Sequence, residues 1–149
     1  METEVLFSDP LYIAFPQDDP HDPPEEVSPD MIDGGRLLLL EDGHCLKEHA
    51  LAACNRAELR TEATITGTSL HTLVQMVDNG LGVTLLPEMA INGGILANTH
   101  ITARPVRSEQ AHRDIALIWR RNSPRETDFR MMAGILRNAA TRGREALAA

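Results

Sequence analysis

The stretch EDGHCLKEHALAAC, residues 41–54, holds both cysteines of the chain. It follows four leucines at residues 37–40, which predict a buried strand. An Asp-Gly pair breaks that strand, and a helical pattern begins at about His44. Cys45 is therefore expected at a strand-to-helix junction, where backbone N–H groups and the helix dipole stabilise a thiolate. Cys54 is expected near the far end of the same helix.

The spacing of the two cysteines has a mechanical consequence. In one straight helix their Cα atoms would lie about 13 Å apart, because an α-helix rises about 1.5 Å per residue. A disulfide requires Cα atoms within about 7 Å, so the thiols can pair only if the segment is rebuilt. Closing so short a loop constrains the unfolded chain by about 2–3 kcal/mol. Spacing alone leaves two hypotheses open, a redox switch or two ordinary buried cysteines.

Composition and charge exclude several classes of protein. The chain has 149 residues, enough for one compact domain or two small lobes. Its net charge of −8 opposes binding to a phosphate backbone, which requires clustered Lys and Arg. No apolar run reaches the roughly 18 residues of a membrane span, and the acidic first residues lack the layout of a signal peptide. We expect a cytoplasmic chain, in which a disulfide would be transient and sensory.

The first half of the chain predicts strands separated by one irregular loop. Residues 5–15 are typical of an extended segment, with a strand at 11–15. Residues 16–29 contain five prolines and five acidic residues, so we expect a surface loop there. No function is assigned to this loop.

Residues 63–86 predict a strand, a helix and a second strand. Thr68 or Ser69 is expected to cap the helix after a strand at 63–67, and residues 82–86 form the next strand. One face of the helix carries its apolar side chains: Leu70, Leu73, Val74 and Val77. This order favours a right-handed βαβ unit with a parallel sheet.

The last third of the chain predicts four further elements. These are a short helix at 87–91, an edge strand at 100–106, an apolar strand at 114–119, and a final helix. Ser123 is expected to cap the final helix, with Pro124 at its first position. The basic, Ala-rich tail from Thr141 is expected to fray.

Three runs carry a resemblance to a known family. Residues 41–54 and the run TSLHTLVQMVDNGLGVTLLPEMAI, residues 68–91, resemble the regulatory domain of LysR-type transcriptional regulators. The run DIALIWRRNSP, residues 114–124, is similar to the closing strand of that domain. The GHCLKE core with a second cysteine nine positions on resembles the OxyR branch, which senses hydrogen peroxide.

The resemblance implies an α/β fold of the periplasmic-binding-protein-like type, as in LysR effector domains. Lobe II would be essentially complete, at residues 9–113. Residues 1–8 would cross from lobe I, and residues 114–149 would supply the C-terminal strand and helix of lobe I. Members of the family read DNA through an N-terminal winged helix-turn-helix. We expect that part and the first half of lobe I to be absent, so that this chain alone does not bind DNA.

The resemblance also implies a thiol switch, with no cofactor and no enzymatic turnover. Cys45 would be the peroxidatic thiol and Cys54 the resolving thiol, which would form a reversible disulfide after reaction with hydrogen peroxide. His44, Lys47 and Arg113 would stabilise the thiolate or polarise the peroxide, although the family usually has Arg in place of Lys47. The family forms homo-oligomers through its regulatory domains, and glutaredoxin or thioredoxin-type systems would reduce the disulfide.

Four alternatives are weighed against the thiol switch. Thr68 and Ser69 lie where LysR-type domains meet small organic effectors, so the chain could bind such a ligand and have inert cysteines. The same two residues could serve only as helix caps. A thiol peroxidase would need a reductant and a motif that the sequence lacks. A zinc site of both cysteines with His44 and His49 does not match the usual ligand spacing, so we expect no metal.

Overall fold

The computed structural model describes residues 1–55 and 65–149 of the chain. By their contacts these residues form two units, Met1–Asp9 with Asp114–Ala149, and Pro10–Arg113. Strands β1 (Glu2–Pro16) and β6 (His112–Trp119) each contribute residues to both units. The assignment of residues 1–8, 9–113 and 114–149 to lobes of a family domain stays a prediction.

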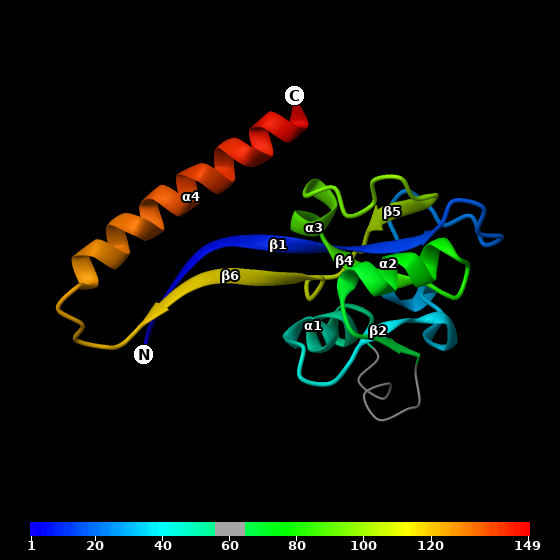
Figure 1. Cartoon of the computed structure of the whole chain (residues 1–149), viewed down its shortest axis with the longest axis horizontal. Coiled ribbons are helices and arrows are strands. Elements are labelled where there is room, and N and C mark those ends of the chain that lie inside the picture. Colours follow the sequence, from blue (N-terminus) through cyan, green and yellow to red (C-terminus); the bar gives the residue numbers. More distant parts are fainter. Residues whose placement is uncertain (56–64) are drawn as a thin grey trace. The chain divides into compact units, whose positions relative to one another are not determined.

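Strand β1 is the centre of the larger sheet (Figure 1). It pairs antiparallel with β4 (Thr84–Pro87) on one side and with β5 (Ile101–Pro105) on the other. Its side chains alternate between two apolar clusters, because successive residues of a strand point to opposite faces. Ile13 lies in the larger cluster, whereas Ala14 packs in the smaller cluster with Val74 and Leu86. The expected edge strand at 100–106 is confirmed as β5.

A second, two-stranded sheet precedes the cysteine segment. Strand β2 (Leu39–Leu40) pairs in parallel with β3 (Thr66–Gly67), and Leu37 forms a parallel bridge with Val83. All four leucines at 37–40 are buried, as predicted. Of the strand predicted at 63–67, residues 63 and 64 lie outside the described part of the chain.

The prediction of one parallel sheet is wrong for β4. This strand pairs antiparallel with β1 rather than continuing the parallel pairing of the Val83 bridge. A short apolar run shows that a strand is buried, but it does not show which neighbour the strand will pair with. The partner of the strand is determined by the tertiary packing.

Helix α2 (Leu70–Asp78) follows the predicted capping. Ser69 is its N-cap, and the Ser69 Oγ accepts a hydrogen bond from the backbone N–H of Thr72 at 3.2 Å. Leu73, Val74 and Val77 are buried, which confirms the predicted apolar face. The short helix predicted at 87–91 is α3 (Glu88–Asn92).

The C-terminal helix departs from its prediction at both ends. Helix α4 (Glu126–Ala148) begins after Arg125, so the prediction of Ser123 as its N-cap is wrong. The Ser123 Oγ instead accepts a hydrogen bond from the Arg125 backbone N–H at 3.3 Å, in the turn before the helix. The predicted fraying from Thr141 is also wrong, because Ala, Arg, Glu and Leu of the tail favour helix and extend it to Ala148.

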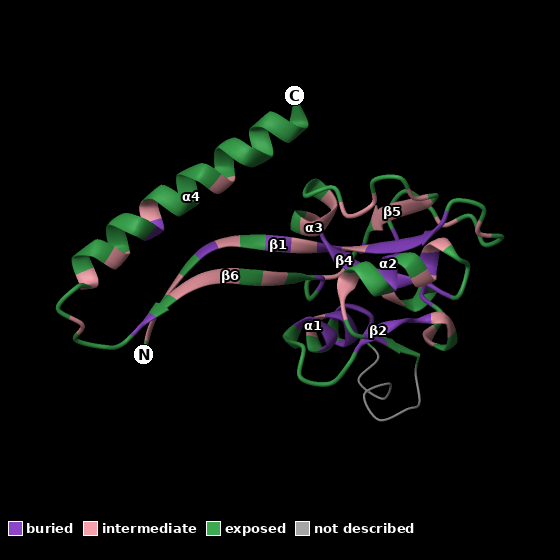
Figure 2. Ribbon diagram, in the orientation of Figure 1, coloured by how far each residue is buried: buried purple, intermediate pink, exposed green. Residues whose placement is uncertain are grey.

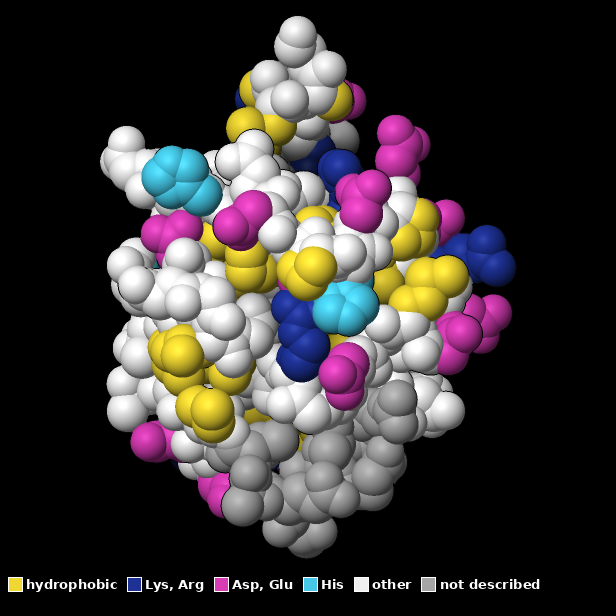
Figure 3. Space-filling model, turned by 90° about the vertical axis from the view of Figure 1, so that its right-hand side faces the viewer, with side chains coloured by type: hydrophobic (Ala, Val, Ile, Leu, Met, Phe, Trp, Pro, Cys, Tyr) yellow, Lys and Arg dark blue, Asp and Glu magenta, His cyan; other side chains and the backbone are white. Residues whose placement is uncertain are grey.

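Burial is concentrated in the unit Pro10–Arg113. Figure 2 shows β2, β4 and the second half of β1 mostly buried and α4 mostly exposed. On the face drawn in Figure 3, hydrophobic side chains lie in small separate groups among charged and polar ones. Within residues 1–55 and 65–149, no helix combines the length and the apolar character that crossing a membrane requires.

Candidate functional site

Helix α1 (Cys45–Ala53) carries the two cysteines at its two ends. His44 is its N-cap and Cys54 its C-cap, which confirms the helix predicted from about His44. The Cys54 backbone N–H donates to the Ala50 carbonyl at 3.1 Å, so the helical hydrogen bonds reach the second cysteine. Leu46, Ala50 and Leu51 are buried and anchor the helix to the core.

The two thiols differ in exposure and face different spaces. Cys45 is exposed, whereas Cys54 is only 1% exposed. Both cysteines lie within the described residues, and no disulfide joins them. Across this continuous helix their Cα atoms are separated by about 13 Å. The structure is therefore that of a thiol form, in which the two sulfurs are too far apart to react.

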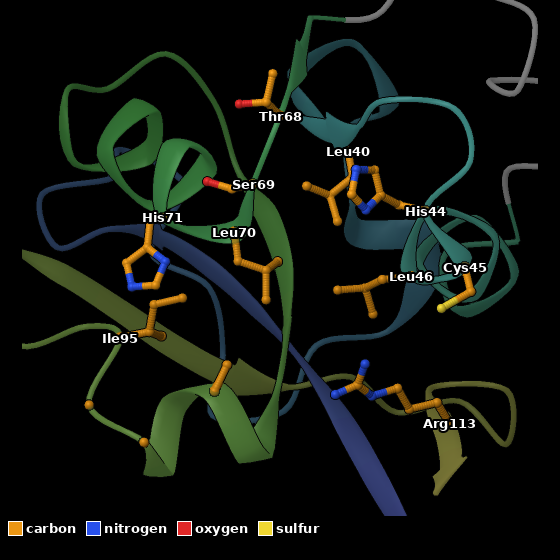
Figure 4. A pocket seen from close by; sticks show the side chains of 13 residues that line it. Leu40, His44, Cys45, Leu46, Thr68, Ser69, Leu70, His71, Ile95 and Arg113 are labelled. Carbon is orange, nitrogen blue, oxygen red and sulfur yellow. The ribbon is translucent and has the colours of Figure 1, made fainter.

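Cys45 lies at the edge of an open cleft of about 580 Å³, which we call the Cys45 cleft. Its walls are supplied by the end of β2, the starts of α1 and α2, the segment around α3, and Arg113 at the start of β6. Its polar lining residues are His44, Cys45, Thr68, Ser69, His71 and Arg113. Figure 4 shows the Cys45 sulfur and the Arg113 guanidinium on one side, with Ser69 and His71 on the α2 side.

The lining of the Cys45 cleft is basic in an acidic chain. It contains one arginine and two histidines, and none of its described lining residues is Asp or Glu. The chain as a whole carries a net charge of −8. A guanidinium and two imidazoles beside the N-terminal turns of two helices suit a polar or anionic reactant. The lining therefore offers one cationic group and several hydrogen-bond donors to a molecule in the cleft.

Lys47 is placed differently from the other predicted site residues. It is only 6% exposed and is not among the residues that line the cleft. Its Nζ donates to the Asp42 Oδ1 at 2.6 Å, and this hydrogen bond lowers the pKa of Asp42. The Lys47 ammonium is thus engaged on the turn before α1, and its predicted role toward peroxide stays a prediction.

Thr68 and Ser69 line the cleft from the facing wall. Ser69 also caps α2, so capping and exposure to the cleft are compatible at this residue. His71 was not identified from the sequence. Its position in the first turn of α2, two residues after the cap, was the available signal, because side chains there lie close to a ligand bound at the helix start.

No metal centre is apparent in the described residues. Among them no group of three or more His, Cys, Asp or Glu side chains is placed to hold a metal ion. Cys45 and Cys54 lie at opposite ends of α1, which separates the two sulfurs that a shared tetrahedral site would need together.

Comparisons with known proteins identify the family to which the chain belongs. The LysR substrate binding domain matches residues 1–141. The HTH-type transcriptional regulator EstR of Acinetobacter baylyi is 39% identical over 128 residues, which are 85% of this chain and 42% of that protein. The hydrogen peroxide-inducible genes activator of Dickeya chrysanthemi is 35% identical over 132 residues, which are 89% of this chain and 43% of that protein.

The same fold is found among solved structures. The reduced form of the regulatory domain of OxyR2 from Vibrio vulnificus superposes with a TM-score of 0.79 at 37% sequence identity. The match covers 93% of this chain and 65% of that one. The chain spans 42% and 43% of the length of the two curated relatives described above.

Proposed function

The chain belongs to the LysR substrate-binding-domain family, and from this we propose that it is the peroxide-sensing regulatory part of a LysR-type transcriptional regulator. It would switch by a reversible disulfide between Cys45 and Cys54. It is similar to relatives named as transcriptional regulators, and we propose no catalytic turnover for it.

One observation carries the proposal. The exposed thiol of Cys45 and the guanidinium of Arg113 line one cleft, while the second thiol is held at the other end of the same short helix. A reactive thiol needs access and nearby positive charge, and the exposure of Cys45 and its shared cleft with Arg113 support this role. A resolving thiol needs to become available only after the first has reacted, which suits a buried Cys54.

The chemistry proceeds in two balanced steps. The Cys45 thiolate attacks one oxygen of hydrogen peroxide, so that an S–O bond forms, the O–O bond breaks, and the departing hydroxide takes a proton to become water. We expect Arg113 and His44, which line the same cleft, to donate hydrogen bonds to the departing oxygen. The Cys54 sulfur then attacks the sulfenic sulfur, an S–S bond forms, and a second water leaves. Two thiols are oxidised by two electrons as one peroxide is reduced.

The second step requires α1 to change. Its two ends must approach to within about 7 Å, which a continuous helix of this length forbids. Oxidation therefore selects a rebuilt segment, and such a two-state element is what a switch needs. We propose that this change alters a homo-oligomer formed through the regulatory domains. DNA would be bound by a winged helix-turn-helix outside this chain, and glutaredoxin or thioredoxin-type systems in the cytoplasm would restore the thiols.

A second candidate function is the binding of a small organic effector. The Cys45 cleft, at about 580 Å³, is larger than a peroxide molecule needs and has the size of a ligand pocket. The cleft also presents the hydroxyls of Thr68 and Ser69. In this reading the cysteines are inert, and the cleft binds a polar molecule with an apolar part.

Peptide mapping after mild peroxide treatment separates the two functions. Trypsin cuts after Arg36, Lys47 and Arg56, which puts Cys45 and Cys54 on separate peptides. We expect a linked pair of these peptides that dithiothreitol separates. Thiols left unlinked, or Cys45 oxidised alone to the sulfinic acid, would contradict the switch in this chain and would favour the effector-binding function.

A further inference from the structure

Lys47 and Asp42, which lie on either side of Cys45 in the sequence, form an ion pair. Asp42 precedes Cys45 in the turn before α1, and Lys47 follows it in the first helical turn. The Lys47 Nζ donates to the Asp42 Oδ1 at 2.6 Å. The pair therefore ties the turn to the helix across the position of Cys45. In the structure it forms with residues 45–47 in the first turn of α1.

The two members of the pair differ strongly in their exposure to solvent. The Lys47 side chain is 7% exposed, whereas the Asp42 side chain is 91% exposed. Lys47 shares a small gap of about 10 Å³ with Leu40, Leu70 and Leu85, which belong to β2, α2 and β4. An ammonium in such a setting is costly unless a carboxylate accepts from it. Asp42 supplies that carboxylate from the solvent side.

We propose that the Lys47–Asp42 pair is a latch that holds α1 in its helical, thiol form and so sets how readily Cys45 and Cys54 join. Its link to the disulfide rests on the proposed function, whereas its effect on α1 does not. Lys47 is in this view a positioning residue, which acts through α1 and not on the peroxide.

The direction of the effect follows from the two states. In the helical state, loss of the carboxylate leaves the Lys47 ammonium nearly buried and without the acceptor it now has. In any rebuilt segment both groups can reach water, so the same loss costs little. Removing Asp42 therefore destabilises the helical state selectively. Because Asp42 is exposed, the effect corresponds to a change of about two- to fivefold in the opening equilibrium of α1.

The first experiment measures alkylation of each thiol in the reduced 149-residue chain, resolved by mass spectrometry. Cys54 is buried at the C-cap of α1, so its alkylation requires a local opening, and unwinding of α1 is the opening that the latch would govern. Asp42→Asn should accelerate alkylation of Cys54 by about two- to fivefold and leave the exposed Cys45 nearly unchanged. An unchanged Cys54 rate, or equal acceleration of both thiols, would overturn the latch.

Two matched controls separate the latch from a general loss of stability. Glu41→Gln removes a carboxylate from the same turn without touching the pair, and Glu41 is exposed. Asp19→Asn breaks another ion pair of the same unit, that with Arg36. Neither change should reproduce the acceleration at Cys54. If Asp19→Asn matches Asp42→Asn, the effect is global and the latch is refuted.

A double-mutant cycle tests whether the two residues act through each other. Lys47→Met keeps the length and the apolar stem of the side chain but removes its charge, so no buried ammonium needs a carboxylate. Asp42→Asn should then have no further effect on the Cys54 rate. An undiminished effect in the Lys47→Met background would show that Asp42 acts independently of Lys47, which would overturn the proposal.

The second experiment measures the disulfide equilibrium in glutathione buffers. Asp42→Asn should shift this equilibrium toward the disulfide by about two- to fivefold, as for the alkylation rate. Glu41→Gln should leave the equilibrium unchanged. If the wild-type chain forms no Cys45–Cys54 disulfide, the proposed function fails, and the alkylation rates still decide the latch. If the disulfide forms but Asp42→Asn leaves its equilibrium unchanged, the proposed function stands and the latch fails.

Discussion

Asp19 shows how a nearly buried carboxylate can stabilise a loop that has no regular structure. Its side chain is 2% exposed and forms an ion pair with Arg36, and it accepts a hydrogen bond from the His21 backbone N–H at 2.9 Å. Burial acts to raise the pKa of Asp19, but the hydrogen bonds from Arg36 and His21 outweigh burial and lower that pKa to about 2. The proline-rich loop at 16–29 is thereby fixed to the turn that leads into the buried leucines.

This shift predicts a pH dependence of stability. The folded pKa of Asp19 lies below its unfolded value, so its stabilisation is complete above about pH 4 and is lost as the pH falls toward 2. Asp19→Asn should lower the free energy of unfolding at pH 7 by about 2 kcal/mol and remove this part of the acid dependence. Urea unfolding at pH 7 and pH 3 measures both effects. The exposed neighbour Asp18, changed to Asn, is the control, and equal losses in the two variants would contradict the prediction.

The order of the two thiols in the proposed reaction is also testable at single residues. Cys54→Ser removes the resolving thiol, so peroxide should leave Cys45 as a sulfenic acid that dimedone can trap. Cys45→Ser should give no adduct, because Cys54 is only 1% exposed. Mass spectrometry of the intact chain detects the adduct. A dimedone adduct on Cys54 in the Cys45→Ser variant would reverse the assignment of the two roles.

At the scale of the elements, the backbone at Gly82, just before β4, lies very close to the backbone at Arg36. A Cβ at this position would lie 2.3 Å from the backbone oxygen of Arg36. Next to this contact, the Val83 N–H donates to the same Arg36 carbonyl at 2.9 Å, and the Leu38 N–H donates to the Val83 carbonyl at 2.8 Å. Only glycine allows this approach without displacing one of the two segments.

Gly82→Ala should therefore be strongly destabilising. The new methyl group must displace backbone, which costs about 1–3 kcal/mol or more, as overpacking in a core does. Thermal unfolding measures the loss. Gly134→Ala in α4 is the matched control, because its Cβ would meet nothing within 4 Å, and it should raise stability by about 0.5–1 kcal/mol. A Gly82→Ala variant as stable as wild type would show that the two segments can separate freely.

At the scale of the whole molecule, the exposed apolar surface of α4 is the most prominent feature. Met131, Ile135, Leu136 and Leu147 are 40–66% exposed. Such side chains on one helix invite association, because burying apolar area is favourable by about 25 cal/mol per Å². The net charge of −8 opposes association but acts over a limited range in salt.

We expect the chain to self-associate in a concentration-dependent way. Light scattering coupled to size-exclusion chromatography should show a mass that rises with concentration. Ile135→Lys should shift the distribution toward the monomer, whereas Arg142→Lys on the same helix should not. A monodisperse monomer at every concentration would contradict the prediction.

The sequence by itself determined what depends on local pattern. The strand-to-helix junction before Cys45, the helix that separates Cys45 from Cys54, and the cap at Ser69 follow from apolar spacing, turn residues and capping chemistry. The start of α4 was misplaced by a few residues, because Ser123 can bond the backbone of a turn as well as that of a helix. The family was indicated by short motifs, and its match over residues 1–141 bears this out.

Only the tertiary structure decided what depends on which segments meet. It paired β4 with β1, brought His71 into the Cys45 cleft, and engaged Lys47 with Asp42 on the turn before α1. A local pattern specifies that a residue is buried or that a helix begins, because those properties depend on near neighbours. The partner of a strand or of a long charged side chain is chosen among many distant groups by packing and desolvation, which no single stretch of sequence contains.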